Sequence, residues 1–97
     1  MINHIKFTEI ILYVKDQDAS CKFYQNIFRR PPDLNVPGMT EFNISNNCKV
    51  GLMPNKGIAN ILGPKMPHPD TGTGIPRCEL YLQVDNIQEE FENAIKS

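Results

Sequence analysis

The chain has 97 residues, which is the size of one small domain and too short for a two-domain enzyme. Ten Lys and Arg against eleven Asp and Glu give a net charge of −1, without the basic surplus of a nucleic-acid-binding protein. The longest apolar run, Ile10 to Val14, is far shorter than the roughly 20 residues that cross a bilayer. Three cysteines without a C-x-x-C pair argue against a zinc ribbon or disulfide scaffold and favour a cytoplasmic location.

The first predicted strand covers residues 7–14, a run rich in β-branched and aromatic side chains. Because side chains alternate between the faces of a strand, one face is fully apolar and carries Ile10, Leu12 and Val14. The other face is mixed and carries Glu9, Ile11 and Tyr13. Asp16 then predicts the N-cap of a helix with an apolar stripe at helical spacing, which Pro31 and Pro32 end.

Two further strands are predicted at residues 40–44 and 48–53, joined by a polar turn, and a short strand is possible near Asn35–Val36. The composition then changes, because five prolines and four glycines lie between Pro54 and Pro76. We expect a linker or a long, exposed and mobile loop there, and one helical turn at residues 58–62 is compatible with the pattern.

The opening pattern returns near the end of the sequence. Residues 78–84 are predicted to form a strand, and Asp85–Asn86 to cap a helix with apolar residues at Ile87, Phe91, Ala94 and Ile95. Residues 9–16 align with residues 79–86 without a gap, at an offset of 70 positions. Both segments begin with Glu, reach Val five residues later and then meet a helix cap, which indicates an internal repeat.

These residues resemble the vicinal oxygen chelate superfamily, which includes glyoxalase I, bleomycin-resistance proteins, fosfomycin-resistance enzymes and extradiol dioxygenases. The first-module signature is matched by Glu9, Val14, Lys15, Asp16, Ser20, Phe23 and Tyr24. Residues 51–54 look like the end of a first module, and residues 79–85 like the start of a second. The resemblance implies an α+β fold with a βαβββ module at residues 1–55 and a Pro/Gly-rich linker at 56–76. Residues 77–97 would be the strand and helix of an incomplete second module.

The resemblance also implies a divalent metal (Mg, Mn, Ni, Fe or Zn), with Glu9 and Glu79 as equivalent ligands and as the groups that move protons. Strand alternation by itself places each of these carboxylates on the mixed face of its strand, and we expect the two to face a shared concavity. Paired carboxylates suit the harder cations better than zinc. Residues 49–56, where the family places a further ligand, hold no acid and no histidine; Met53 and Asn55 are the nearest candidates. A protein that binds no metal is therefore also compatible with the sequence.

Three functions are compatible with these observations. The first is a metal-dependent lyase or isomerase similar to lactoylglutathione lyase. The second is a metal-free protein that binds a flat hydrophobic antibiotic or metabolite in a cleft lined by Ile11, Tyr13, Met53 and Tyr81. The third is an inactive fragment. In each case we expect a homodimer, because an incomplete second module leaves an apolar sheet edge unpaired.

Overall fold

The computed structural model describes residues 4–75 and 79–97, which form a small α+β protein with one four-stranded sheet and three α-helices in the described part. The elements in chain order are β1 (Thr8–Val14), α1 (Gln17–Phe28), β2 (Leu34–Val36), β3 (Met39–Ser45), β4 (Cys48–Pro54), α2 (Asn55–Leu62), the 3-10 turn η1 (Pro69–Gly72) and α3 (Ile87–Lys96). The βαβββ succession expected for the first part of the chain is therefore observed.

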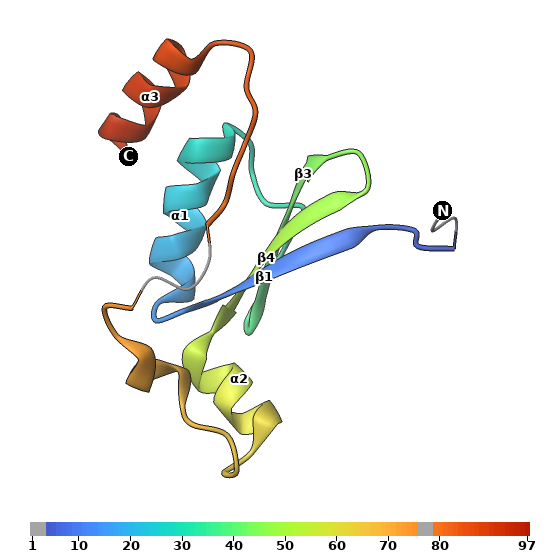
Figure 1. Cartoon of the computed structure of the whole chain (residues 1–97), viewed down its shortest axis with the longest axis vertical. Coiled ribbons are helices and arrows are strands. Elements are labelled where there is room, and N and C mark those ends of the chain that lie inside the picture. Colours follow the sequence, from blue (N-terminus) through green and yellow to red (C-terminus); the bar gives the residue numbers. More distant parts are fainter. Residues whose placement is uncertain (1–3, 76–78) are drawn as a thin grey trace.

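The sheet has the strand order β1-β4-β3-β2 and is mixed (Figure 1). β1 runs parallel to β4, whereas β4 with β3 and β3 with β2 form antiparallel pairs. A parallel pair needs a long crossover connection, and α1 together with β2 and β3 supplies it. Because β1 and β4 are parallel, both strands end at the same edge of the sheet, where α2 begins.

The core lies between one face of the sheet and α1. Phe42, Val50 and Leu52 are fully buried, and Cys21 of α1 is 6% exposed. The half-buried apolar residues that pack against this cluster are Leu12, Val14, Tyr24, Phe28 and Ile44. The predicted apolar face of β1 is thus confirmed as the face toward α1, and the alternation places Glu9, Ile11 and Tyr13 on the opposite face.

Local signals place the ends of α1 as the sequence predicts. The Asp16 side chain accepts a hydrogen bond from the backbone N–H of Ala19 at 3.0 Å and so caps the first turn. The helix ends at Arg29, which adopts a left-handed conformation (φ 56°) and donates its backbone N–H to the carbonyl of Gln25.

Two predictions for the second half of the chain need correction. Residues 55–62 form a helix of eight residues, longer than one turn, and its Ile58 is buried, so the Pro/Gly-rich stretch contains packed structure. The strand predicted at residues 78–84 is wrong for the described residues 79–84, which pair with no strand, and Cys78 lies outside the described residues. A strand sequence needs a partner for its backbone groups, and the four-stranded sheet of this chain does not supply one.

The second predicted helix is confirmed as α3. Its N-cap is Asn86, whose side chain accepts from the backbone N–H of Glu89 at 3.1 Å. Arg29 pairs with Glu89 at 2.9 Å and with Glu90 at 3.1 Å, so α3 is attached to the end of α1 by polar contacts. Its apolar stripe stays exposed, with accessible fractions from 60% to 78% at Ile87, Phe91 and Ile95.

Candidate functional site

The candidate site is the face of the sheet opposite α1, which we call the open face. The register pairs Glu9 with Lys49, Ile11 with Gly51, Tyr13 with Met53, and Glu41 with Gly51. Residues paired across strands share a face, so this face collects side chains from three strands: Glu9, Ile11, Tyr13, Met39, Glu41, Lys49 and Met53. Ile11 is 42% and Tyr13 50% exposed, so apolar surface remains uncovered there.

Gly51 makes room for two carboxyl groups in the middle of this face. A Cβ atom on Gly51 would lie 2.5 Å from Glu9 Oε2 and 2.7 Å from the terminal methyl of Met39. The side chains of Glu9 in β1 and Met39 in β3 therefore extend over Gly51 from its two sides. With the glycine in β4, Glu9 of β1 and Glu41 of β3 meet across the strand that separates them.

The surroundings of this pair favour the protonated form of Glu9. Burial raises the pKa of Glu9, and a hydrogen bond to Glu41 and the negative charge of Glu41 raise it further, whereas the positive charge of Lys49 lowers it. Lys49 Nζ lies 3.9 Å from Glu41 Oε1 and 4.4 Å from the centroid of the Phe7 ring. The cluster is thus a carboxyl pair with one ammonium group beside it, surrounded by apolar side chains.

One oxygen of this pair has no partner. Glu9 Oε2 is buried and accepts no hydrogen bond from the described residues. Such an atom favours a donor or a cation beside it. Nevertheless, the described residues bring no group of three or more His, Cys, Asp or Glu side chains together, and Lys49 already supplies a positive charge to Glu41. The side chains of one chain therefore do not fit a complete divalent-metal site.

The fold brings together only some of the site residues that the sequence predicts. Ile11, Tyr13 and Met53 share the open face with Glu9. Glu79 and Tyr81 lie in the irregular segment before α3, where Glu79 is exposed and Tyr81 is 84% exposed. Other residues of that segment line a groove together with residues of α1: Leu80, Leu82, Gln83 and Val84. The segment runs beside α1, on the helix-covered side of the sheet (Figure 1).

Glu41 is the site residue that the sequence analysis missed. The alternation that places Phe42 in the core places Glu41 on the same face as Glu9. That signal was available in the sequence from Thr40 to Ile44. The order of the strands in the sheet could not be derived from the sequence, and that order brings Glu41 close to Glu9.

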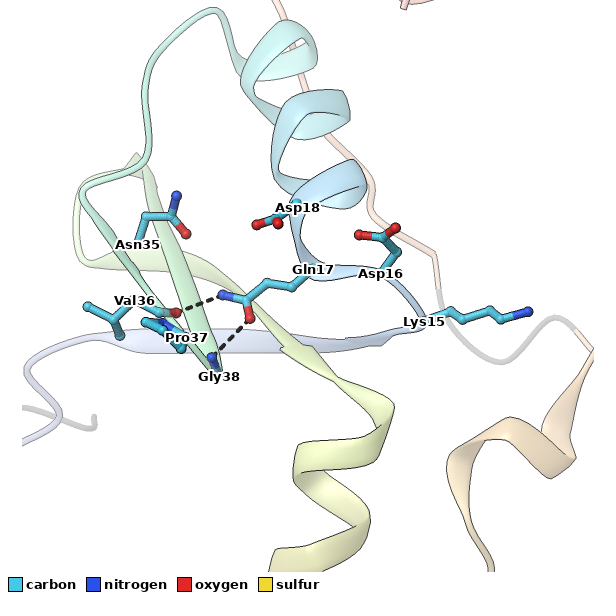
Figure 2. Close-up of a pocket in the computed structure, with 8 residues that line it drawn as sticks. All are labelled: Lys15, Asp16, Gln17, Asp18, Asn35, Val36, Pro37 and Gly38. Atoms are coloured by element: carbon cyan, nitrogen blue, oxygen red, sulfur yellow. Dashed lines mark hydrogen bonds between the residues drawn. The ribbon is translucent and has the colours of Figure 1, made fainter.

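A groove at the N-terminus of α1 has a structural role (Figure 2). It is lined by residues 15–18 and 35–38. The Gln17 amide crosses it, donating to the Val36 carbonyl at 2.8 Å and to Thr40 Oγ1 at 2.9 Å, and accepting from the backbone N–H of Gly38 at 2.9 Å. These bonds attach α1 to the turn between β2 and β3.

Comparisons of this chain with protein-family models, with curated proteins and with solved structures found no match in any of the three. Within residues 4–75 and 79–97, no helix has the length and apolar character needed to cross a membrane.

Proposed function

We propose that this chain is a glyoxalase-like member of the vicinal oxygen chelate superfamily and that its open face binds a small organic molecule. The observation that carries this proposal is the Glu9–Glu41 carboxyl pair, which shares the open face with the exposed apolar side chains of Ile11 and Tyr13. Apolar surface with a few convergent polar groups is the usual chemistry of small-molecule sites. The polar pair would orient the ligand, and the apolar residues would supply most of the contact area.

The fold supports the family assignment. The chain has a βαβββ succession, which is the order of elements that the resemblance implies. The signature residues have local roles that fit it, since Glu9 and Val14 lie in β1 and Asp16 caps α1. Of the internal repeat, the helix cap is observed, because Asn86 caps α3 as Asp16 caps α1.

A single open face encloses a ligand on one side only, so the proposal includes a homodimer. A closed two-fold pairing would set the open face of one copy against that of the other. Each copy would then contribute Glu9, Glu41, Ile11 and Tyr13 to a shared cleft. This arrangement would also cover apolar side chains that water otherwise contacts.

The binding proposal is tested with 8-anilinonaphthalene-1-sulfonate, a fluorescent probe of accessible apolar surface. We expect the native protein to enhance its fluorescence and Ile11→Glu to reduce the enhancement several-fold. Ile87→Glu is the matched control, because Ile87 is 78% exposed on α3, away from the open face. If Ile87→Glu removes the signal and Ile11→Glu keeps it, the binding surface is α3 and the proposal is wrong.

A second candidate is a lyase or isomerase in which Glu9 moves a proton. The raised pKa of Glu9 favours it, because a general acid–base group works best when its pKa approaches the working pH. A metal-dependent form would need ligands from a second chain in addition to Glu9. Metal analysis of the purified protein and of Glu9→Ala tests this form. Stoichiometric metal that Glu9→Ala loses, together with lactoylglutathione formation that Glu9→Gln abolishes, would favour the enzyme over the metal-free binder.

A further inference from the structure

A cavity lies at the end of the sheet where β1 begins and the β3–β4 turn closes. It has a volume of about 520 Å³, within the range of small-molecule sites. The register pairs Cys48 with both Thr8 and Ser45, and the Thr8 backbone N–H donates to the Asn47 carbonyl at 2.8 Å. The start of β1 and the turn therefore lie side by side and form walls of this cavity, which we call the basic pocket.

The lining of the basic pocket contains three cations and no acid. It consists of residues 6–7, Arg30 and residues 43–49, in which Lys6, Arg30 and Lys49 are the charged side chains. The hydroxyl group of Ser45 and the amide groups of three asparagines add hydrogen-bond donors. A lining of this composition favours a negatively charged group of a ligand.

Two of these cations have ammonium protons available for a ligand. Lys6 forms no ion pair with any described residue. Lys49 Nζ lies 3.9 Å from Glu41 Oε1, which is too far for a hydrogen bond. Arg30 is different, because its Nη2 already pairs with Asp33 Oδ1 at 3.1 Å. The two lysines are therefore the groups that can pair with an anion in this pocket.

Lys49 belongs to both the basic pocket and the open face. It is the register partner of Glu9, and its Nζ lies 4.4 Å from the centroid of the Phe7 ring. Ile11 follows Glu9 by two residues on the same face, a distance of about 7 Å along the strand. A molecule whose apolar part contacts Ile11 can therefore place a substituent beside Lys49. Burial raises the pKa of Glu9, and its neutral form does not repel an anionic substituent there.

We propose that the molecule bound on the open face carries an anionic group, a carboxylate or a phosphate, which lies in the basic pocket and pairs with Lys6 and Lys49. The proposal rests on the proposed function, because it names the class of ligand that the open face takes. It also assigns a ligand-binding role to the end of the sheet at the β3–β4 turn, which the sequence analysis left outside the site.

The test compares three probes that share a naphthalene ring: 2-naphthoate, 2-naphthyl phosphate and the uncharged 2-naphthamide. Each probe is titrated into the complete chain, and binding is followed by NMR. We expect at least one of the anions to bind at least about fivefold more tightly than the amide, because a charge-assisted hydrogen bond is stronger than a neutral one. The tighter anion should shift the backbone signals of Asn46, Asn47 and Cys48 in addition to those of Ile11 and Gly51.

Two charge-removing variants locate the anionic group. Lys6→Gln and Lys49→Gln should each reduce the preference for the anion over the amide, and the double variant should remove it. Lys6 is exposed and precedes β1, so Lys6→Gln tests the pocket even if Lys49→Gln disturbs the sheet. Lys96→Gln is the matched control, because it removes the same charge from the last turn of α3, and it should keep the preference.

Three results would overturn the anionic group. Equal affinity of the three probes does so, but leaves the open-face proposal standing if they shift the signals of Ile11 and Gly51. An equal loss of preference in Lys96→Gln also does so, because the attraction then depends only on the overall charge of the protein. If none of the probes binds, the anionic group is wrong, and the fluorescence experiment with Ile11→Glu decides the open face separately.

Discussion

Gly51 decides where two carboxyl groups lie in this protein. Any other residue at this position would place a Cβ atom against Glu9 Oε2 and the Met39 methyl group. Without that atom, Glu9 and Glu41 reach each other across β4, and the environment of Glu9 favours its protonated form. Because Gly51 has no side chain, the carboxyl groups of Glu9 and Glu41 can interact on the open face.

The first prediction concerns the pH dependence of stability. Because the pKa of Glu9 is raised in the folded state, the folded protein binds this proton more tightly than the unfolded chain does. The stabilisation is therefore fully present below the ordinary glutamate pKa and is lost as the pH rises through the raised pKa of Glu9. We expect the free energy of unfolding, measured with urea across this range, to decrease with pH in the wild type and to depend less on pH in Glu9→Gln.

Glu79→Gln is the matched control, since Glu79 is an exposed glutamate in the irregular segment. It should retain the pH dependence of the wild type. Gly51→Ala should behave as Glu9→Gln does, because the added methyl group pushes the Glu9 carboxyl group away from Glu41. An unchanged slope in Gly51→Ala would contradict the carboxyl pair.

At the scale of elements, the position of α1 depends on a side chain that also closes a turn. Gln17 bridges the first turn of α1 to the β2–β3 connection through three hydrogen bonds. One of its partners, Thr40, is fully buried. The apolar stripe of α1 predicts that the helix packs on a sheet, but this amide fixes where along the sheet the helix starts (Figure 2).

The second prediction tests this contact. Gln17→Ala should lower the free energy of unfolding by about 2 kcal/mol, because it removes three hydrogen bonds, two of which are half-buried. Gln25→Ala makes the same chemical change at an exposed position of the same helix, and we expect no loss there, since alanine has the higher helix propensity. Urea denaturation of both variants measures the difference. Equal stability of the two variants would show that the Gln17 bonds contribute nothing.

At the scale of the whole molecule, much apolar surface is exposed for a chain of this size. Ile11, Tyr13 and Val36 are exposed on or beside the open face, and α3 presents a second apolar stripe on the other side. β1 is also an edge strand of seven residues, and no strand of the described residues pairs with its outer side. Edges and apolar patches of this kind promote association.

The third prediction is therefore a homodimer. Light scattering at micromolar concentration should give twice the 11.0 kDa mass of the chain. Tyr13→Glu should shift the protein toward the monomer, because it places a charge in the proposed contact between open faces.

Phe91→Glu, on the exposed stripe of α3, is the matched control and should leave the dimer intact. The reverse result would move the interface to α3. A wild-type species of 11 kDa that unfolds cooperatively would refute the dimer altogether.

Local patterns in the sequence determined β1, α1, the β3–β4 hairpin and α3, because caps, turns and alternation act over only a few residues. They also determined that Glu9, Ile11 and Tyr13 share one face of their strand. The repeat, however, predicted a strand at residues 78–84, and its described part, residues 79–84, forms no strand. Strand propensity is realised only when a neighbouring strand takes up the backbone hydrogen bonds, and that partner is a tertiary property.

The tertiary structure alone decided which acids meet. The sequence indicates Glu79 as the partner of Glu9, because the two occupy equivalent places in a repeat. In the folded chain Glu41 takes that role, since β4 inserts between β1 and β3 and carries Gly51 at the crossing point. The packing of η1 against α2 could not be predicted from the sequence either, because the contacts that hold it include the hydrogen bond between Asn55 and Asp70, which are fifteen residues apart. Contacts of this range follow from the order of the strands and from the path of the chain, which local periodicity does not contain.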